Sequence, residues 1–151
     1  MGDTRRAHEL VGRSRAESER QGAHHERAEA DLATIEILVR ERRADAALDA
    51  LGRLLADDAA RAALDAFAPM VQRLRGVALV QQGDRPGGRA VLAGALAAAR
   101  SDDNTYAVAL LLDQLAEVDA PQDPAGAARA RAEASALFRT LGVVRPARCP
   151  V

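Results

Sequence analysis

One spacing of small and large apolar residues occurs three times in this chain and constrains its fold more than any other feature. A small residue is followed by apolar residues four, seven and eight positions later, which places all of them on one face of an α-helix. The copies begin at Ala47, Gly88 and Ala130, so they are 41 and 42 residues apart. A recurring period in this range indicates stacked helical pairs, in which each unit buries its apolar face against its neighbours.

Residues 74–100 contain the clearest of these units and are predicted to form two helices joined by a tight turn. Gly83 is expected to end the first helix, because glycine adopts the left-handed conformation of a helix C-terminus at little cost. Pro86 suits the first turn of the second helix, where a missing N–H leaves nothing unpaired. Two amphipathic helices connected this closely are expected to pack antiparallel.

The rest of the chain predicts further helices of similar length. Pro69 should break the chain, since its ring clashes inside a helix, and Gly142 should cap the last helix. The sequence thus predicts an all-α fold, a short α-solenoid of antiparallel helical hairpins with about seven helices in residues 1–142, followed by an extended C-terminal tail at 143–151. Outside the central unit the expected helices cover residues 4–21, 23–42, 44–56, 59–68, 105–118 and 124–141.

The central unit also resembles a known repeat family. The bare period suits HEAT-like repeats better than tetratricopeptide repeats, which run to about 34 residues. The pattern within the unit nevertheless resembles the tetratricopeptide signature, and insertions at residues 57–68 and around Pro121 fit the extra length. Gln72, Arg75 and Arg100 depart from that signature. The residues that carry the resemblance are Gly76, Leu79, Gly83, Asp84, Gly88, Leu92, Ala95 and Leu96.

A second resemblance covers about the last half of the chain. Residues 83–118 and 136–151 are similar to the C-terminal region of actinobacterial multidomain proteins, namely adenylate/guanylate cyclase-like proteins and ATP-dependent transcriptional regulators. Such proteins join an ATPase module to a long tetratricopeptide-like array. The resemblance implies a sensor or regulatory module, and it transfers no catalytic residue, because the catalytic domains of those proteins have no counterpart in this sequence.

Composition excludes several function classes. The net charge is −1, and the 28% of charged residues have interspersed signs, so no basic surface for nucleic acid is expected. No apolar run approaches the ~20 residues of a membrane helix. The single cysteine, Cys149, provides neither a disulfide framework nor a cysteine metal site. Because charged residues interrupt the first apolar positions, no signal peptide is expected, and we expect a cytoplasmic protein.

The candidate chemical sites are weak. His25 and Glu29 lie one helical turn apart, but a third metal ligand is not evident. The glycine-rich stretch 83–88 lacks the lysine of a phosphate loop and follows a helix, so a repeat turn is the better interpretation. Cys149 is expected at a disordered tail position rather than as a reactive thiol. The serines without suggestive His or Asp partners are Ser14, Ser18, Ser101 and Ser135.

We therefore expect a chain that is not an enzyme, with no catalytic, cofactor-binding or metal-binding residues. The expected function is a protein–protein interaction scaffold, and the alternative is the detached regulatory module that the second resemblance implies. The partner would be a protein, a peptide or a neighbouring domain. Arg40, Arg42 and Arg43 form a basic cluster that could contact an acidic partner.

The beginning of the chain predicts an incomplete repeat. By the repeat phase, residues 4–21 correspond to the second helix of a unit whose first helix would precede Met1. Leu10 and Val11 give this mostly polar helix a small apolar face. Two explanations fit this helix: a native cap of the array, or the end of a longer protein that has been cut down. We favour the second, in which the apolar face would pair with a missing domain or, in a homodimer, with a second copy of the chain.

Overall fold

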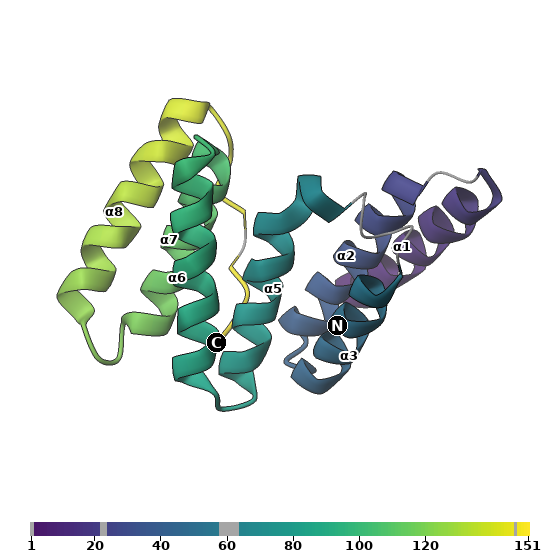
Figure 1. The fold of residues 1–151 in the computed structure, drawn as a ribbon, viewed down its shortest axis with the longest axis horizontal. Helices are drawn as coiled ribbons and strands as arrows, with labels where there is room; N and C mark the ends of the chain where they lie inside the picture. Colours follow the sequence, from purple (N-terminus) through teal and green to yellow (C-terminus); the bar gives the residue numbers. More distant parts are fainter. Residues whose placement is uncertain (1, 22–23, 58–63, 147) are drawn as a thin grey trace.

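The computed structural model describes the backbone of residues 2–21, 24–57, 64–146 and 148–151, and the side chains of the same ranges except 2–5 and 17–21. These ranges contain no strand, so the prediction of an all-α chain with about seven helices is confirmed for them. The elements are α1 (Gly2–Gln21), α2 (His24–Arg40), α3 (Ala44–Ala56), the 3-10 helix η1 (Asp65–Phe67), α5 (Ala68–Gln81), α6 (Arg85–Ser101), α7 (Thr105–Asp119) and α8 (Pro124–Leu141) (Figure 1).

The helix ends follow the capping residues of the sequence. Gly83 and Gly142 have positive φ angles of 98° and 65°, as expected after α5 and α8. The expected helix at 23–42 ends at Arg40 instead, because Arg42 adopts a φ of 59°, which interrupts the helix. Side-chain oxygens of Asp84, Asn104 and Asp123 accept hydrogen bonds from the backbone N–H groups of Gly87, Ala107 and Gly126 at 2.9, 3.0 and 2.8 Å.

The region before α5 was predicted to contain a short helix at residues 59–68. Half of that range, residues 59–63, lies outside the described residues, while Asp65–Phe67 form η1 and Ala68 begins α5. Pro69 stands in the first turn of α5, where its missing N–H leaves nothing unpaired. The predicted break at Pro69 is therefore confirmed.

Helices that follow one another in sequence pack together, notably α1 with α2, α5 with α6 and α7 with α8. In addition, α5 contacts both α2 and α7, so these three helices run through the middle of the molecule (Figure 1). The buried apolar residues form two clusters, one from α2, α3 and α5 and one mainly from α6, α7 and α8. Helix α5 contributes to both, with Leu74 and Val77 in the first cluster and Val80 in the second.

The pair formed by α5 and α6 crosses at two glycines. A Cβ atom on Gly76 would lie 2.6 Å from Cγ of Leu92, and one on Gly88 would lie 2.4 Å from the carbonyl oxygen of Gly76. Neither contact is sterically allowed, so the close approach of the two helices requires glycine at both positions. Leu92 fills the space beside this crossing and is fully buried.

Residues 143–151, here called the tail segment, carry no helix, strand or turn at any described position, but they do not extend away from the helices. The segment runs from the end of α8 across α7 to α5 (Figure 1). Cys149 is 0% exposed and belongs to the first core cluster, and Val151 packs against both clusters. The prediction of a disordered position for Cys149 was wrong, because two apolar side chains of the segment reach the seam between the clusters.

Candidate functional site: the surface that holds the tail segment

The candidate site is the surface on which the tail segment lies. Side chains from α5, α7 and the turn after α2 donate hydrogen bonds to backbone carbonyl groups of the segment. Nε2 of Gln114 donates to Cys149 at 3.0 Å, Nε2 of Gln81 to Pro150 at 2.6 Å, and Nη1 of Arg42 to Val151 at 3.1 Å. We define the docking surface as Arg42, Arg73, Gln81, Asp113, Gln114 and Glu117.

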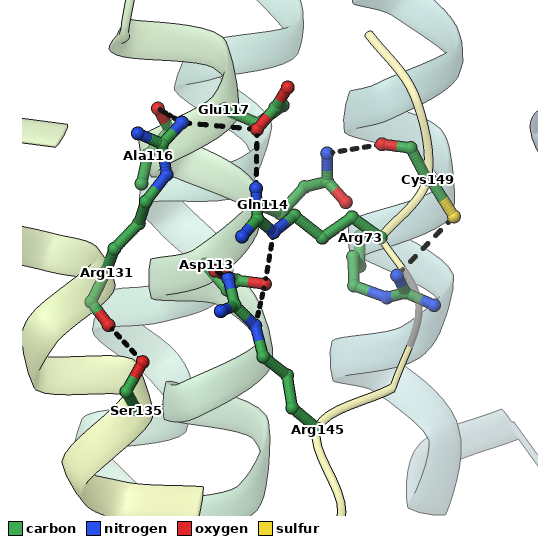
Figure 2. A network of polar contacts seen from close by, with 10 residues as sticks. Arg73, Asp113, Gln114, Ala116, Glu117, Arg131, Ser135, Arg145 and Cys149 are labelled. Atoms are coloured by element: carbon green, nitrogen blue, oxygen red, sulfur yellow. Dashed lines mark hydrogen bonds and ion pairs between the residues drawn. The ribbon is translucent and has the colours of Figure 1, made fainter. Parts of the chain in front are cut away.

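Asp113 and Glu117, an acidic pair on α7, form the negatively charged part of the docking surface (Figure 2). The Asp113 carboxylate accepts hydrogen bonds from Nε of Arg145 at 3.0 Å and from Nε of Arg148 at 2.9 Å, and Nη2 of Arg145 also contacts it. One turn along α7, Oε2 of Glu117 accepts from Nη1 of Arg148 at 2.9 Å. The Asp113 side chain is only 6% exposed, so both arginines compensate a carboxylate that is largely removed from water.

Arg73 lies beneath the tail segment and is buried, with 4% of its surface exposed. Its Nη1 donates to Sγ of Cys149 at 3.5 Å, and its Nη2 donates to Oε1 of Glu36 at 3.0 Å. Burial by itself would raise the pKa of Glu36, but the adjacent guanidinium groups of Arg73 and Arg40 lower it overall. The Arg73–Glu36 pair therefore places a neutralised ion pair, rather than a free charge, beside Cys149.

The buried thiol of Cys149 is not prepared for nucleophilic chemistry. Burial raises the pKa of Cys149, and this outweighs the opposing effect of Arg73. The thiol is therefore protonated at neutral pH, whereas a nucleophilic cysteine needs a lowered pKa. In this arrangement Cys149 serves as a small apolar side chain that fills a pocket.

The three arginines predicted to contact a partner have different roles. Arg40 pairs with Glu36 at 3.1 Å, and Arg43 pairs with Glu41 at 3.3 Å, so both engage acids close in sequence. Arg42 is the member of the cluster that the structure brings to the docking surface. Its positive φ places it after the end of α2, where its guanidinium reaches the carbonyl of Val151.

The other candidate residues from the sequence pack against neighbours or belong to helix turns. The ring of His25 lies against that of Phe67, with centroids 4.9 Å apart. The glycine-rich stretch at 83–88 is the turn into α6, and Ser135 donates to the carbonyl of Arg131 at 2.8 Å. Across the described ranges, no three His, Cys, Asp or Glu side chains are grouped closely enough to hold a metal ion.

The acids and amides of the docking surface were not identified from the sequence. Asp113 and Gln114 interrupt the most apolar helix of the chain, and both are buried, as is Arg73 in α5. Buried polar groups are exceptional unless they have partners. Their position inside apolar helices was the available signal, and their partners in the tail segment could not be inferred without the fold.

Two apolar cavities lie near the N-terminal ends of α5 and α7, and Arg73 of the docking surface lines the first of them. One of about 180 Å³ lies between these helices and is lined by Phe67, Met70 and Leu110, among others. The other, of about 200 Å³, lies between α2 and α5 and shares Phe67 and Met70 with the first. No described residue of the tail segment lines either cavity, so the docked segment fills neither of them.

Comparison with known proteins adds no family to this description, since neither family models nor curated proteins nor solved structures match the chain. Within the part of the chain that the structure describes, every helix is too short or too polar to cross a membrane. Interpretation of the site therefore depends on its own contacts.

Proposed function

We propose that this chain is a non-catalytic protein-interaction scaffold whose docking surface binds an extended peptide segment of a partner protein. The observation that carries the proposal is the seating of residues 143–151, which are non-helical at every described position and whose main-chain oxygens accept hydrogen bonds from Gln81, Gln114 and Arg42. A surface that already holds one extended segment has the donors and the shape to hold another.

The proposed architecture is a short, tetratricopeptide-like α-solenoid built from antiparallel helical hairpins. The packing of α5 on α6 and of α7 on α8 supports it, because these are the pairs of consecutive helices that such units require. The contacts from α2 to α5 and from α5 to α7 support it further, since stacked units touch through their first helices. In this arrangement the first helices carry the docking surface.

The donor chemistry suits recognition of peptide main chain. Amide and guanidinium groups that bond carbonyl oxygens select an extended conformation while tolerating different side chains. Gln81 is fixed for this role, because its Nε2 also donates to the carbonyl of Val39 at 2.8 Å. A fixed donor loses little conformational entropy on binding, which favours affinity.

The test is selection of binding peptides from a random library of nine-residue segments. The bait is the full-length chain carrying Arg145→Ala and Arg148→Ala, which frees the docking surface by weakening the tail segment. We expect selected peptides to bind this bait and to lose about tenfold or more in affinity when Gln81→Ala and Gln114→Ala are added. Failure to enrich any peptide, or enrichment that ignores both glutamines, would overturn the proposed function.

A further inference from the structure

We infer that the docking surface is specific for an extended peptide with two arginines three positions apart and a small uncharged residue directly after the second. We further infer that the tail segment, which has this pattern at Arg145, Arg148 and Cys149, occupies the site until such a peptide displaces it. The inference rests on the proposed function and adds the chemistry of the partner and its competition with residues 143–151.

The arginine preference follows from the charge and geometry of α7. The Asp113 carboxylate accepts hydrogen bonds from both Nε and Nη2 of Arg145, the planar bidentate contact that a guanidinium makes with a carboxylate. A lysine ammonium cannot form this contact. With its side chain only 6% exposed, Asp113 would be left as a poorly solvated charge beneath any peptide without a cation here.

The spacing of the two arginines follows from the acids they meet. Arg148 bridges Asp113 and Glu117, whose carboxylates project from α7 one helical turn apart. Glu117 is held in turn by Arg131 of α8, whose Nη2 lies 3.2 Å from Oε2 (Figure 2). This anchoring fixes the acid that selects the second arginine, so a shift of that arginine by one position would lose the bridge.

The residue after the second arginine enters an enclosed position. Cys149 is 0% exposed and lies among first-cluster residues, with the Arg73 guanidinium 3.5 Å from its sulfur. A large side chain has no room there, and a cationic one would meet Arg73. A serine, alanine or cysteine fits both limits.

Competition follows from how few contacts hold the link between α8 and the docked part of the segment. Val144 is 93% exposed and Val143 is 42% exposed, so the link from α8 to Arg145 makes little apolar contact. Arg145 and Arg148 also keep 32% and 35% of their side chains exposed, which gives an incoming peptide access to the acids. The short link confers a high effective concentration on the segment, so a free peptide binds the intact chain more weakly than it binds a released surface.

Cys149 provides a direct measure of displacement, because it is the single cysteine of the chain and is buried only while the segment is docked. The probe is a peptide with the sequence of residues 143–151 and serine in place of Cys149, and the matched control peptide has alanine at both arginine positions. With the full-length, wild-type chain, we expect the arginine peptide to trap the undocked state and so to raise the rate of thiol labelling. The expected factor is 1 + [peptide]/Kd, where Kd is the dissociation constant of the peptide from the undocked state. The control peptide should leave the rate unchanged.

Direct binding completes the experiment. Fluorescence anisotropy of the labelled arginine peptide should give an affinity about tenfold or more higher for the Arg145→Ala, Arg148→Ala chain than for wild type. Arg129→Ala with Arg139→Ala, two exposed arginines of α8, removes the same charge and should match wild type. Asp113→Asn should abolish the binding of the arginine peptide.

The outcomes separate the two levels of the proposal. Equal binding of both peptides to the released chain would overturn arginine recognition and leave the proposed function standing. Equal affinity for wild type and the released chain, with no change in labelling, would overturn competition by the tail segment. Failure of both these peptides and of the random library on a folded, released chain would overturn the proposed function itself. The labelling experiment needs no variant, so it decides the competition even if the double substitution prevents folding.

Discussion

The two ends of the described chain show opposite relations between regular structure and anchoring. Helix α1 has 20 residues of helix, yet none of its described side chains, at residues 6–16, is buried, and Leu10 is 58% exposed. The tail segment has no regular structure at its described positions, yet it places Cys149 in the core and two arginines on one buried carboxylate. The shorter and less regular end has the stronger side-chain anchors.

The difference shows that anchoring depends on what the side chains meet, rather than on the backbone conformation. Hydrogen bonds within a helix pair its own backbone N–H and C=O groups, but they do not attach the helix to another element. The tail segment lacks those internal bonds, so its carbonyls accept bonds from α5 and α7, which tie it to the two core clusters. Four substitutions or conditions should test this contrast.

The largest loss of stability is expected for a core residue of α7, the helix that carries Asp113 and Gln114. Leu111→Ala in α7 should lower the free energy of unfolding by about 2–5 kcal/mol, because Leu111 is 1% exposed and its loss leaves a cavity. Leu10→Ala in α1 should change it by less than about 0.5 kcal/mol. Urea unfolding followed by circular dichroism measures both, and similar losses would mean that α1 is also part of the core.

The second effect separates the buried acid of the docking surface from an acid that pairs with an exposed arginine. Asp113→Asn should cost about 1–3 kcal/mol, because Arg145 and Arg148 lose a charged acceptor in a site with little water. Asp119→Asn is the matched control, since Asp119 pairs with Arg89, which is 53% exposed, and it should cost less than about 1 kcal/mol. Thiol labelling of Cys149 should accelerate in the first variant and not in the second. Equal labelling rates would show that Asp113 does not hold the segment.

The third effect is a loss of stability at alkaline pH. Burial raises the pKa of Cys149 in the folded state, so the unfolded chain loses the thiol proton first as pH rises. The stability that the Cys149 thiol contributes is fully present below the ordinary thiol pKa of about 8.5. Above that pH the free energy of unfolding declines by up to about 1.4 kcal/mol per pH unit, until the folded-state pKa is reached. Between pH 7 and pH 10 the midpoint temperature of thermal unfolding should therefore fall more steeply with pH for wild type than for Cys149→Ala. Parallel curves would contradict burial of the thiol.

The smallest effect concerns α1. Nη1 of Arg15 lies 3.2 Å from Oδ1 of Asp31, but the Arg15 side chain is 46% exposed, so Arg15→Ala should change global stability by less than about 0.5 kcal/mol. Amide hydrogen exchange should become faster in α1 and remain unchanged in α7. A global destabilisation would show that α1 is anchored as firmly as the tail segment.

The sequence by itself determined most of the helices and their buried faces. The recurring spacing identified Ala47, Leu92 and Ala134 as buried, Pro86 stands in the first turn of α6 as expected, and α7 and α8 begin where the expected helices 105–118 and 124–141 begin. These features are local, since a helical face and a cap depend on residues within one or two turns. The exception was the end of α2, where the positive φ of Arg42, a residue with no glycine-like preference, left no signal.

Only the tertiary structure decided where residues 143–151 lie and what Asp113, Gln114 and Arg73 do. The contacts that define the docking surface join positions 31 to 109 residues apart, from Arg148 with Glu117 to Arg42 with Val151. No periodicity links such positions. Composition favoured a solvated tail, because two prolines and two arginines are typical of exposed segments. The tail is instead held against the helices, because the seam between the core clusters takes up Cys149 and the acids of α7 compensate the charges of Arg145 and Arg148. The seam and the acids come together only once the helices are packed.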